Sequence, residues 1–124
     1  MIKTLNKTIL VGNLGKTPEF KQQGDVLLAE LSLATHEVKS DGVGTYSQKT
    51  HWHKVTVFNE ALLEHVVKHL EKGDCVYVTG PTRTNTWKDK NEVTRYDTYV
   101  SVSGGDNSIA LIKKVSKNKD TNDN

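Results

Sequence analysis

The chain has 124 residues, with 17 lysines and arginines against 15 acidic residues, and a single cysteine. This length suits one domain with a real hydrophobic core, and one cysteine excludes an internal disulfide or a cysteine metal cluster and fits a reducing compartment. Four lysines lie between residues 113 and 119, so residues 1–112 hold 13 basic and 13 acidic side chains. Bulk charge therefore gives no support for a nucleic-acid partner. No apolar run approaches the ~20 residues of a membrane helix.

The first half of the chain predicts two strands and an extended hairpin arm. Residues 6–12 form the first strand, and the glycines and Pro18 that follow predict its end and a turn. Residues 26–35 alternate as a second strand, with Glu30 and Ser32 on one face. Its other face carries the apolar side chains Leu27, Ala29, Leu31 and Leu33. Residues 36–48 are polar and predict a hairpin arm with a mobile tip.

The segment 50–58 (THWHKVTVF) predicts the strand on which the candidate site depends. Its alternation places His51, His53, Val55 and Val57 on one face. The other face carries Trp52, Lys54, Thr56 and Phe58. Large aromatic side chains beside a lysine are typical of a platform on which unpaired bases stack, and a partner interface or a strand buried on both sides is the alternative.

One helix and several strands are predicted in the second half. Asn59 is a good N-cap, five apolar residues recur at helical spacing up to Leu70, and Gly73 predicts a left-handed C-cap. The acidic face of this helix should point away from a polyanion. Further strands are predicted at 75–80, 82–88, 94–102 and 109–112, with 82–88 and 94–102 paired as a hairpin.

This order of elements predicts an all-β fold with one helix. About five strands with a helix between the third and fourth, and long hairpin arms, are typical of an OB-fold, a small Greek-key barrel. The domain should span residues 1–114, and residues 115–124 have the composition of a disordered polar tail.

Several motifs of the chain resemble bacterial and mitochondrial single-stranded-DNA-binding proteins. The resemblance runs in order from about residue 6 to 112 and is carried by NKTILVGNLG (6–15), LSLAT (31–35), QKTHWHKV (48–55), LEKGDCVYV (70–78), and Arg83, Trp87, Arg95 and Tyr96. It implies an OB-fold, a homotetramer, and sequence-independent binding and coating of single-stranded DNA during replication, recombination and repair. It also implies a cytoplasmic, nucleoid-associated protein, with the mitochondrial matrix as the alternative.

The resemblance also implies roles for individual residues. Base stacking would fall on Trp52, Phe58 and Trp87, of which the strand pattern had already singled out the first two. Phosphate contacts would fall on Lys21, Lys54, Lys72, Arg83, Arg95 and Lys39. His53 and Tyr77 would lie at a subunit contact, with Val76 and Val78 on the same outer sheet surface.

The chain also departs from the family pattern. Lys39 stands where many members have a further tryptophan, Asn85 and Thr86 replace a basic pair, and Glu60 replaces a lysine. We therefore expect binding that is retained but weaker, with fewer released counterions. The acidic-aromatic C-terminal tip through which bacterial members recruit partners is expected to be absent, since residues 120–124 (DTNDN) hold no apolar anchor.

Other functions have little support in the sequence. His51 and His53 point the same way, but zinc sites want three or four ligands, so no metal or other cofactor is expected. No nucleophile motif or phosphate-binding glycine loop is present, so we expect a binding protein and not an enzyme. The alternative is an OB-fold protein-interaction factor of the primosome-accessory type, which the tryptophan pair disfavours.

Overall fold

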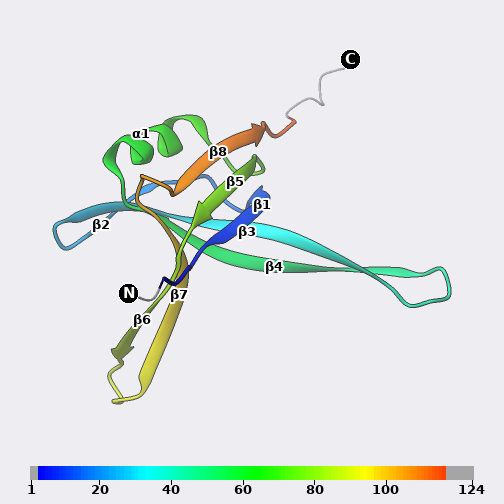
Figure 1. The fold of residues 1–124 in the computed structure, drawn as a ribbon, viewed down its shortest axis with the longest axis horizontal. Coiled ribbons are helices and arrows are strands. Elements are labelled where there is room, and N and C mark those ends of the chain that lie inside the picture. Colours follow the sequence, from blue (N-terminus) through cyan, green and yellow to red (C-terminus); the bar gives the residue numbers. More distant parts are fainter. Residues whose placement is uncertain (1–2, 117–124) are drawn as a thin grey trace.

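The computed structural model describes residues 3–116, and these form one sheet of eight strands with one helix. The elements are β1 (Thr8–Leu14), β2 (Phe20–Gln23), β3 (Val26–Ser40), β4 (Tyr46–Val57), α1 (Glu60–His69), β5 (Cys75–Gly80), β6 (Thr82–Lys88), β7 (Thr94–Val102) and β8 (Ser108–Lys113). Figure 1 shows a central body from which two hairpin arms project, one formed by β3 and β4 and the other by β6 and β7. No helix in residues 3–116 has the length and apolar character needed to cross a membrane.

The strand order is β6-β7-β4-β3-β1-β5-β8, with β2 paired to β3. All pairs are antiparallel except β4 and β7, which run parallel from Val55↔Val100 to Val57↔Val102. The two sides of the curved sheet meet where Ser101 N donates to Pro81 O at 2.9 Å. The helix lies between β4 and β5. These are the third and fourth of the predicted strands, because β2 was not predicted, so the position of the helix is as expected and the arrangement confirms the OB-fold.

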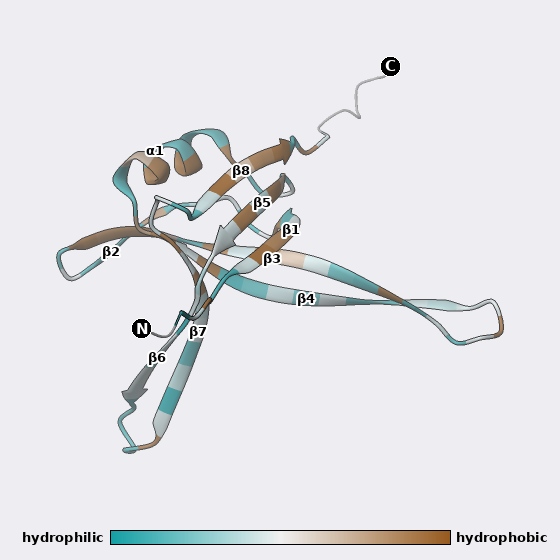
Figure 2. Cartoon of the chain, viewed as in Figure 1, coloured by the Kyte–Doolittle hydropathy of each residue, from teal (hydrophilic) through white to brown (hydrophobic). Residues whose placement is uncertain are grey.

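The core lies inside the curved sheet and is closed by the helix. Figure 2 shows apolar residues concentrated in the central body, whereas both arms are largely polar. Glycine at position 12 is required because a Cβ there would collide with the carbonyl oxygen of Ala34 on β3. The buried cluster consists of Leu14, Ala29, Leu31, Leu33, Val55, Val57, Leu63, Val66, Leu70, Val76, Val78, Val100, Val102 and Ile109.

The structure corrects several sequence-based predictions of local structure. The first strand continues through Leu14 because Leu14 N donates to Asp74 O at 2.9 Å, which extends the pairing with β5. Strand β2 was not predicted, since Phe20–Gln23 has little apolar character and is exposed. Leu27 is also exposed, while Leu28 on the opposite face is buried.

The helix also ends earlier than predicted. Asn59 is the N-cap, as expected, and its Oδ1 accepts a hydrogen bond from Leu62 N at 3.1 Å. The helix stops at His69, because Leu70 turns to an extended conformation and enters the core. Gly73 does adopt a positive φ of 95°, but in the following turn, where its N–H donates to Leu14 O at 2.8 Å.

That turn holds a fully buried carboxylate, Asp74. It accepts hydrogen bonds from Glu71 N at 2.9 Å, Val115 N at 2.8 Å and Lys114 Nζ at 2.9 Å. Burial alone would raise the pKa of Asp74, but the Lys114 hydrogen bond and the two amides outweigh it and hold the pKa below its ordinary value. Val115, the first residue assigned to the tail by the sequence, is thus bound to the domain. The rest of the predicted tail, apart from Ser116, lies outside the described residues.

We expect Asp74→Asn to lower the free energy of unfolding by about 1–3 kcal/mol at neutral pH, because a buried charge-assisted hydrogen bond is lost. A carboxyl whose pKa is depressed by folding stabilises the fold above its unfolded pKa, about 3.9, and this contribution is lost as the pH falls through the folded pKa. The variant should therefore lose less stability than the parent in acid. Denaturant titrations at decreasing pH measure both effects. Asp25→Asn, in an exposed turn, is the control, and equal behaviour of the two variants would contradict the prediction.

Candidate nucleic-acid interface

Trp52 lies at the centre of the candidate interface, on the outer face of β4. This residue is 61% exposed, although the neighbouring Val55 and Val57 of the same strand are buried in the core. Ala34 is its register partner on β3, and a Cβ at Gly15 would lie 2.5 Å from the indole Cζ3. The main chain at Gly15 is fixed by a 2.8 Å hydrogen bond from its N–H to Ser32 O. The indole of Trp52 therefore packs against small residues on one side, and the rest of its surface is open to solvent.

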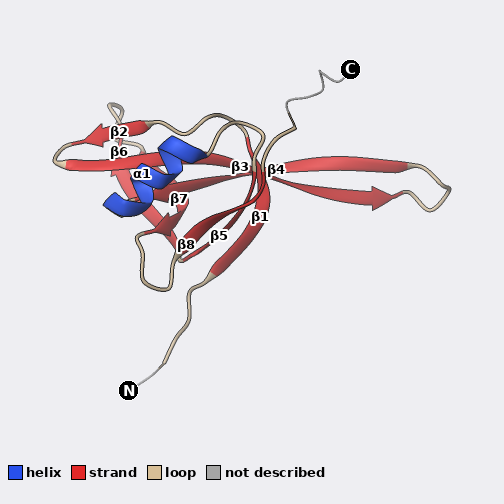
Figure 3. Cartoon of the chain, turned by 90° about the horizontal axis from the view of Figure 1, so that it is seen from above, coloured by secondary structure: helices blue, strands red, loops and turns tan. Residues whose placement is uncertain are grey.

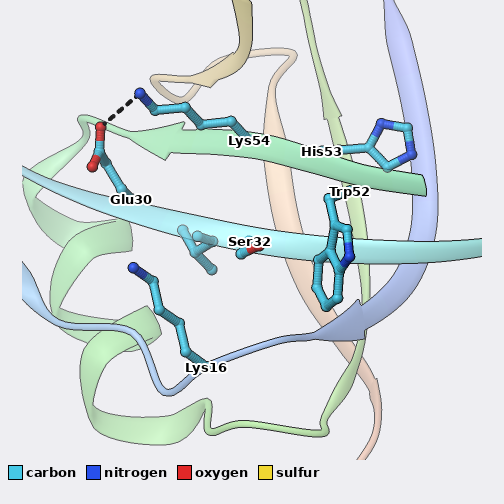
Figure 4. Close-up of a pocket in the computed structure, with 7 residues that line it drawn as sticks. Lys16, Glu30, Ser32, Trp52, His53 and Lys54 are labelled. Carbon is cyan, nitrogen blue, oxygen red and sulfur yellow. Dashed lines mark ion pairs between the residues drawn. The ribbon is translucent and has the colours of Figure 1, made fainter. Parts of the chain in front are cut away.

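Two hollows have Trp52, His53 and Lys54 in their lining. Figure 4 shows the first, of about 270 Å³, whose lining includes Lys16, Glu30, Ser32, Trp52 and Lys54. A second hollow of about 280 Å³ has the same three residues of β4 in its lining, together with four residues of β6 and β7: Thr82, Thr98, Tyr99 and Val100. Because these residues are shared, the two hollows adjoin at β4, and we call the surface that they make with β3 and β7 the groove.

Phe58 lies at the far end of this groove, directly after β4. Its ring packs edge-on against Tyr99, with centroids 6.4 Å apart and an interplanar angle of 61°. Its N–H donates to Val102 O at 2.9 Å, which fixes the residue against β7. Sequence reasoning missed Tyr99, although its alternation with the buried Val100 and Val102 places it on the outer face of β7. Phe58 is half-buried, so it offers less open ring surface than Trp52.

The β6–β7 arm carries three of the predicted site residues on one face. The register pairs Arg83 with Tyr99 and Trp87 with Arg95, so these four side chains share the face that also carries Asp97. Trp87 is 53% exposed. Arg95 Nε lies 2.9 Å from Asp89 Oδ2, which holds the guanidinium near the end of the arm.

The lysines predicted to contact phosphate do not all lie near the aromatic rings. Lys21 and Lys54 line the hollow of about 150 Å³ that contains Phe58 and Tyr99. Lys39 lies on the β3–β4 arm, where its Nζ is 3.7 Å from Glu37 Oε2. Figure 3 shows that this arm leads away from the body. Lys72 lies in the turn after the helix, where its N–H donates to Thr17 Oγ1 at 3.0 Å. The structure thus places Lys21 and Lys54 together with the aromatic rings, and Lys39 and Lys72 elsewhere.

The two histidines of β4 each have a nearby partner. His53 Nε2 is 2.9 Å from Thr35 Oγ1, and His51 Nε2 is 3.0 Å from Glu37 Oε1. Burial, assisted by the charge of His51, lowers the pKa of His53. Within residues 3–116 there is no group of three or more histidine, cysteine or acidic side chains placed to hold a metal ion.

The outer face of β1, β5 and β8 forms a separate apolar surface. Tyr77 is half-buried there, between its register partners Val11 and Ala110. Ile9 and Val11 on this face are each more than half exposed, at 56% and 51%. The expectation that Val76 and Val78 share it is wrong, because both point inward and are buried in the core.

An OB-type barrel with exposed indoles along a groove that contains lysines defines a class of protein that binds single-stranded nucleic acid. The model of the single-strand binding protein family matches residues 5–110. The chain therefore belongs to the single-strand binding protein family.

Individual relatives agree with this assignment. A single-stranded DNA-binding protein of Rickettsia felis is 33% identical over 125 residues, covering 99% of this chain and 82% of the relative. One of Rhizobium meliloti is 36% identical over 114 residues, covering 90% of this chain and 66% of the relative. Among solved structures, a Plasmodium falciparum SSB complex with ssDNA superposes with a TM-score of 0.79 at 30% identity, covering 91% of this chain and 99% of that one.

The packing of the Trp52 indole against Gly15 leads to a prediction for Gly15→Ala. The added methyl would overlap the indole, so the ring must move and its surroundings must change. In a Trp87→Phe background Trp52 is the remaining indole, since the chain has two tryptophans. We expect a shift of the fluorescence emission maximum and weaker oligo-dT binding, while circular dichroism stays that of a folded protein. An emission spectrum identical to that of the Trp87→Phe parent would contradict the packing described.

Proposed function

We propose that the chain binds and coats single-stranded DNA without regard to base sequence, in replication, recombination and repair. The single observation that carries this proposal is the open indole of Trp52 in a groove between β3, β4 and β7. Every base has a π-face, so stacking on such a ring does not distinguish bases. Membership of the single-strand binding protein family supports the same function. Binding, not catalysis, is therefore the activity we assign.

Trp52, Phe58 and Trp87 are proposed to stack bases, and Lys21, Lys54, Arg83 and Arg95 to contact phosphates. Lys39 and Lys72 would contact only DNA that continues beyond the groove, along the β3–β4 arm and past the turn after the helix. The alternative, a protein-interaction factor of the primosome-accessory type, predicts no preference for single strands. A gel shift with oligo-dT and with duplex of equal length separates the two, since only the DNA-binding proposal predicts retention of the single strand.

We further propose that the protein works as a homotetramer associated with cellular DNA, in the cytoplasm or, as the alternative, in the mitochondrial matrix. The apolar outer face of β1, β5 and β8 supports an assembly because large exposed apolar patches mark interaction surfaces. His53 and Tyr77 are the proposed contact residues. The residues on which the expectation about a C-terminal tip rests lie outside residues 3–116.

The stacking proposal predicts that Trp52→Ala and Trp87→Ala each weaken single-strand binding by about 1–3 kcal/mol per stacked base. The loss should be similar on oligo-dT and on mixed sequences, and oligo-dT should quench the tryptophan fluorescence of the parent. For the half-buried Phe58, Phe58→Leu removes the ring and keeps most of the packing. Fluorescence anisotropy with labelled oligonucleotides measures each affinity.

Tyr96→Ala is the matched control for Trp87→Ala. Tyr96 is 70% exposed on the same arm, but it pairs with Thr86 and so lies on the opposite face. The Tyr96→Ala variant should bind oligo-dT with the affinity of the parent. If both tryptophan variants remain folded and also bind like the parent, the stacking role is wrong.

The assembly proposal predicts a mass of about four times 13.8 kDa by light scattering at micromolar concentration. Val11→Glu places a charge in the apolar face of β1 and should yield smaller species. Val38→Glu, at an exposed position on the β3–β4 arm, is the control and should leave the mass unchanged. A parent protein that is a stable monomer would rule out the tetramer.

A further inference from the structure

The lysine at the centre of the groove is already occupied by carboxylates. Lys54 Nζ lies 2.9 Å from Asp97 Oδ2 on β7 and 3.2 Å from Glu30 Oε2 on β3. The other oxygen of Glu30 lies 2.9 Å from Lys21 Nζ on β2. Figure 4 shows the Lys54–Glu30 pair at the edge of the hollow beside Trp52.

The pKa values of Glu30 and Lys54 in this cluster are both shifted toward the charged form. The hydrogen bond from Lys21 lowers the pKa of Glu30, and Lys54 adds to this against the opposing effect of burial. The hydrogen bond to Asp97 raises the pKa of Lys54, and Glu30 adds to this. With two lysines and two carboxylates, the formal charge of the cluster is zero, although it lines the same hollows as the aromatic rings proposed to bind DNA.

A phosphate must compete with these carboxylates for the same donors. A lysine ammonium has three N–H donors, and in Lys54 two of them face carboxylate oxygens. A lysine that moves to a phosphate leaves a carboxylate unpaired close to the negatively charged strand. A lysine paired with a carboxylate also contributes less to the release of counterions from DNA, which is the main electrostatic gain of binding.

We propose that Glu30 and Asp97 act as internal competitors of DNA phosphate at Lys54 and Lys21, and so set the affinity and the salt dependence of single-strand binding. This inference rests on the proposed function. It adds two acidic residues to the determinants of binding and assigns them a negative contribution. Lys16, which also lines the hollow beside Trp52, forms no ion pair within residues 3–116.

A purely structural role for the cluster predicts the opposite result. The ion pairs connect β2, β3, β4 and β7, and a brace of this kind would position Trp52 and the β6–β7 arm for binding. Removal of a carboxylate would then loosen the groove and weaken DNA binding. Exposed ion pairs typically contribute at most about 1 kcal/mol, so the variants should fold. The sign of the change in affinity therefore decides between the two roles.

The test compares Asp97→Asn, Glu30→Gln and the double variant with the parent. Each affinity for labelled oligo-dT is measured by anisotropy over a series of salt concentrations, and folding is checked by thermal unfolding. We expect severalfold tighter binding at low salt, greatest for the double variant, with the slope of log K against log salt steeper by about 0.7 per freed lysine. Glu64→Gln, which removes one charge from the exposed face of the helix, should match the parent.

Three results would overturn the proposal. Equal or weaker binding by the folded Asp97→Asn and Glu30→Gln variants overturns it, as does an equal gain with Glu64→Gln, which would indicate a general charge effect. In a Lys54→Met background the gain from Asp97→Asn should disappear, and a gain that persists there also overturns the role assigned to Lys54. Failure of the proposed function itself is recognised separately, because the parent would then not bind oligo-dT.

Discussion

The site depends on one uninterrupted antiparallel ladder between β3 and β4, which runs from Ala29↔Val57 to Ser40↔Tyr46. At its inner end the ladder contributes Leu31, Leu33, Val55 and Val57 to the core. At its outer end both faces are exposed and form the arm. Trp52 lies at the junction, where the backbone is still held by the core and the side chain already faces solvent. A rigid ring with an open surface is what base stacking requires.

In the proposed binding mode, stacking has to provide much of the affinity for single strands because the charge of the chain is largely cancelled. Residues 1–112 are formally neutral, and the same balance recurs on a small scale around Lys54. A protein that gains little from counterion release depends on aromatic area and on the fixed placement of its rings. The packing of Trp52 over Gly15 and of Phe58 against Tyr99 provides that placement without any charged group.

Much of the fold could be predicted from the sequence because its strongest signals are local. The alternation in 50–58 and the helical spacing after Asn59 each depend on neighbouring residues, and both were confirmed. Gly73 shows the limit of such signals, since it adopts the positive φ expected of it but in a turn whose partner, Leu14, lies far away in the chain. Strand β2 was missed for a related reason. It has no apolar alternation of its own, and it is a strand because it pairs with β3.

The parts of the site that could not be predicted involve residues far apart in the chain. Lys54 was identified as a cation beside Trp52, but the carboxylate that holds it comes from Asp97, 43 residues later. No local pattern predicts that contact, because it requires the parallel pairing of β4 with β7 and the register of the β6–β7 arm. The same register brings Tyr99 to Phe58 and places Trp87 and Arg83 on the face that carries Asp97. The β4–β7 pairing therefore links Trp52 on β4 to Trp87 on the β6–β7 arm. It also brings Asp97, the proposed competitor of DNA phosphate, to Lys54.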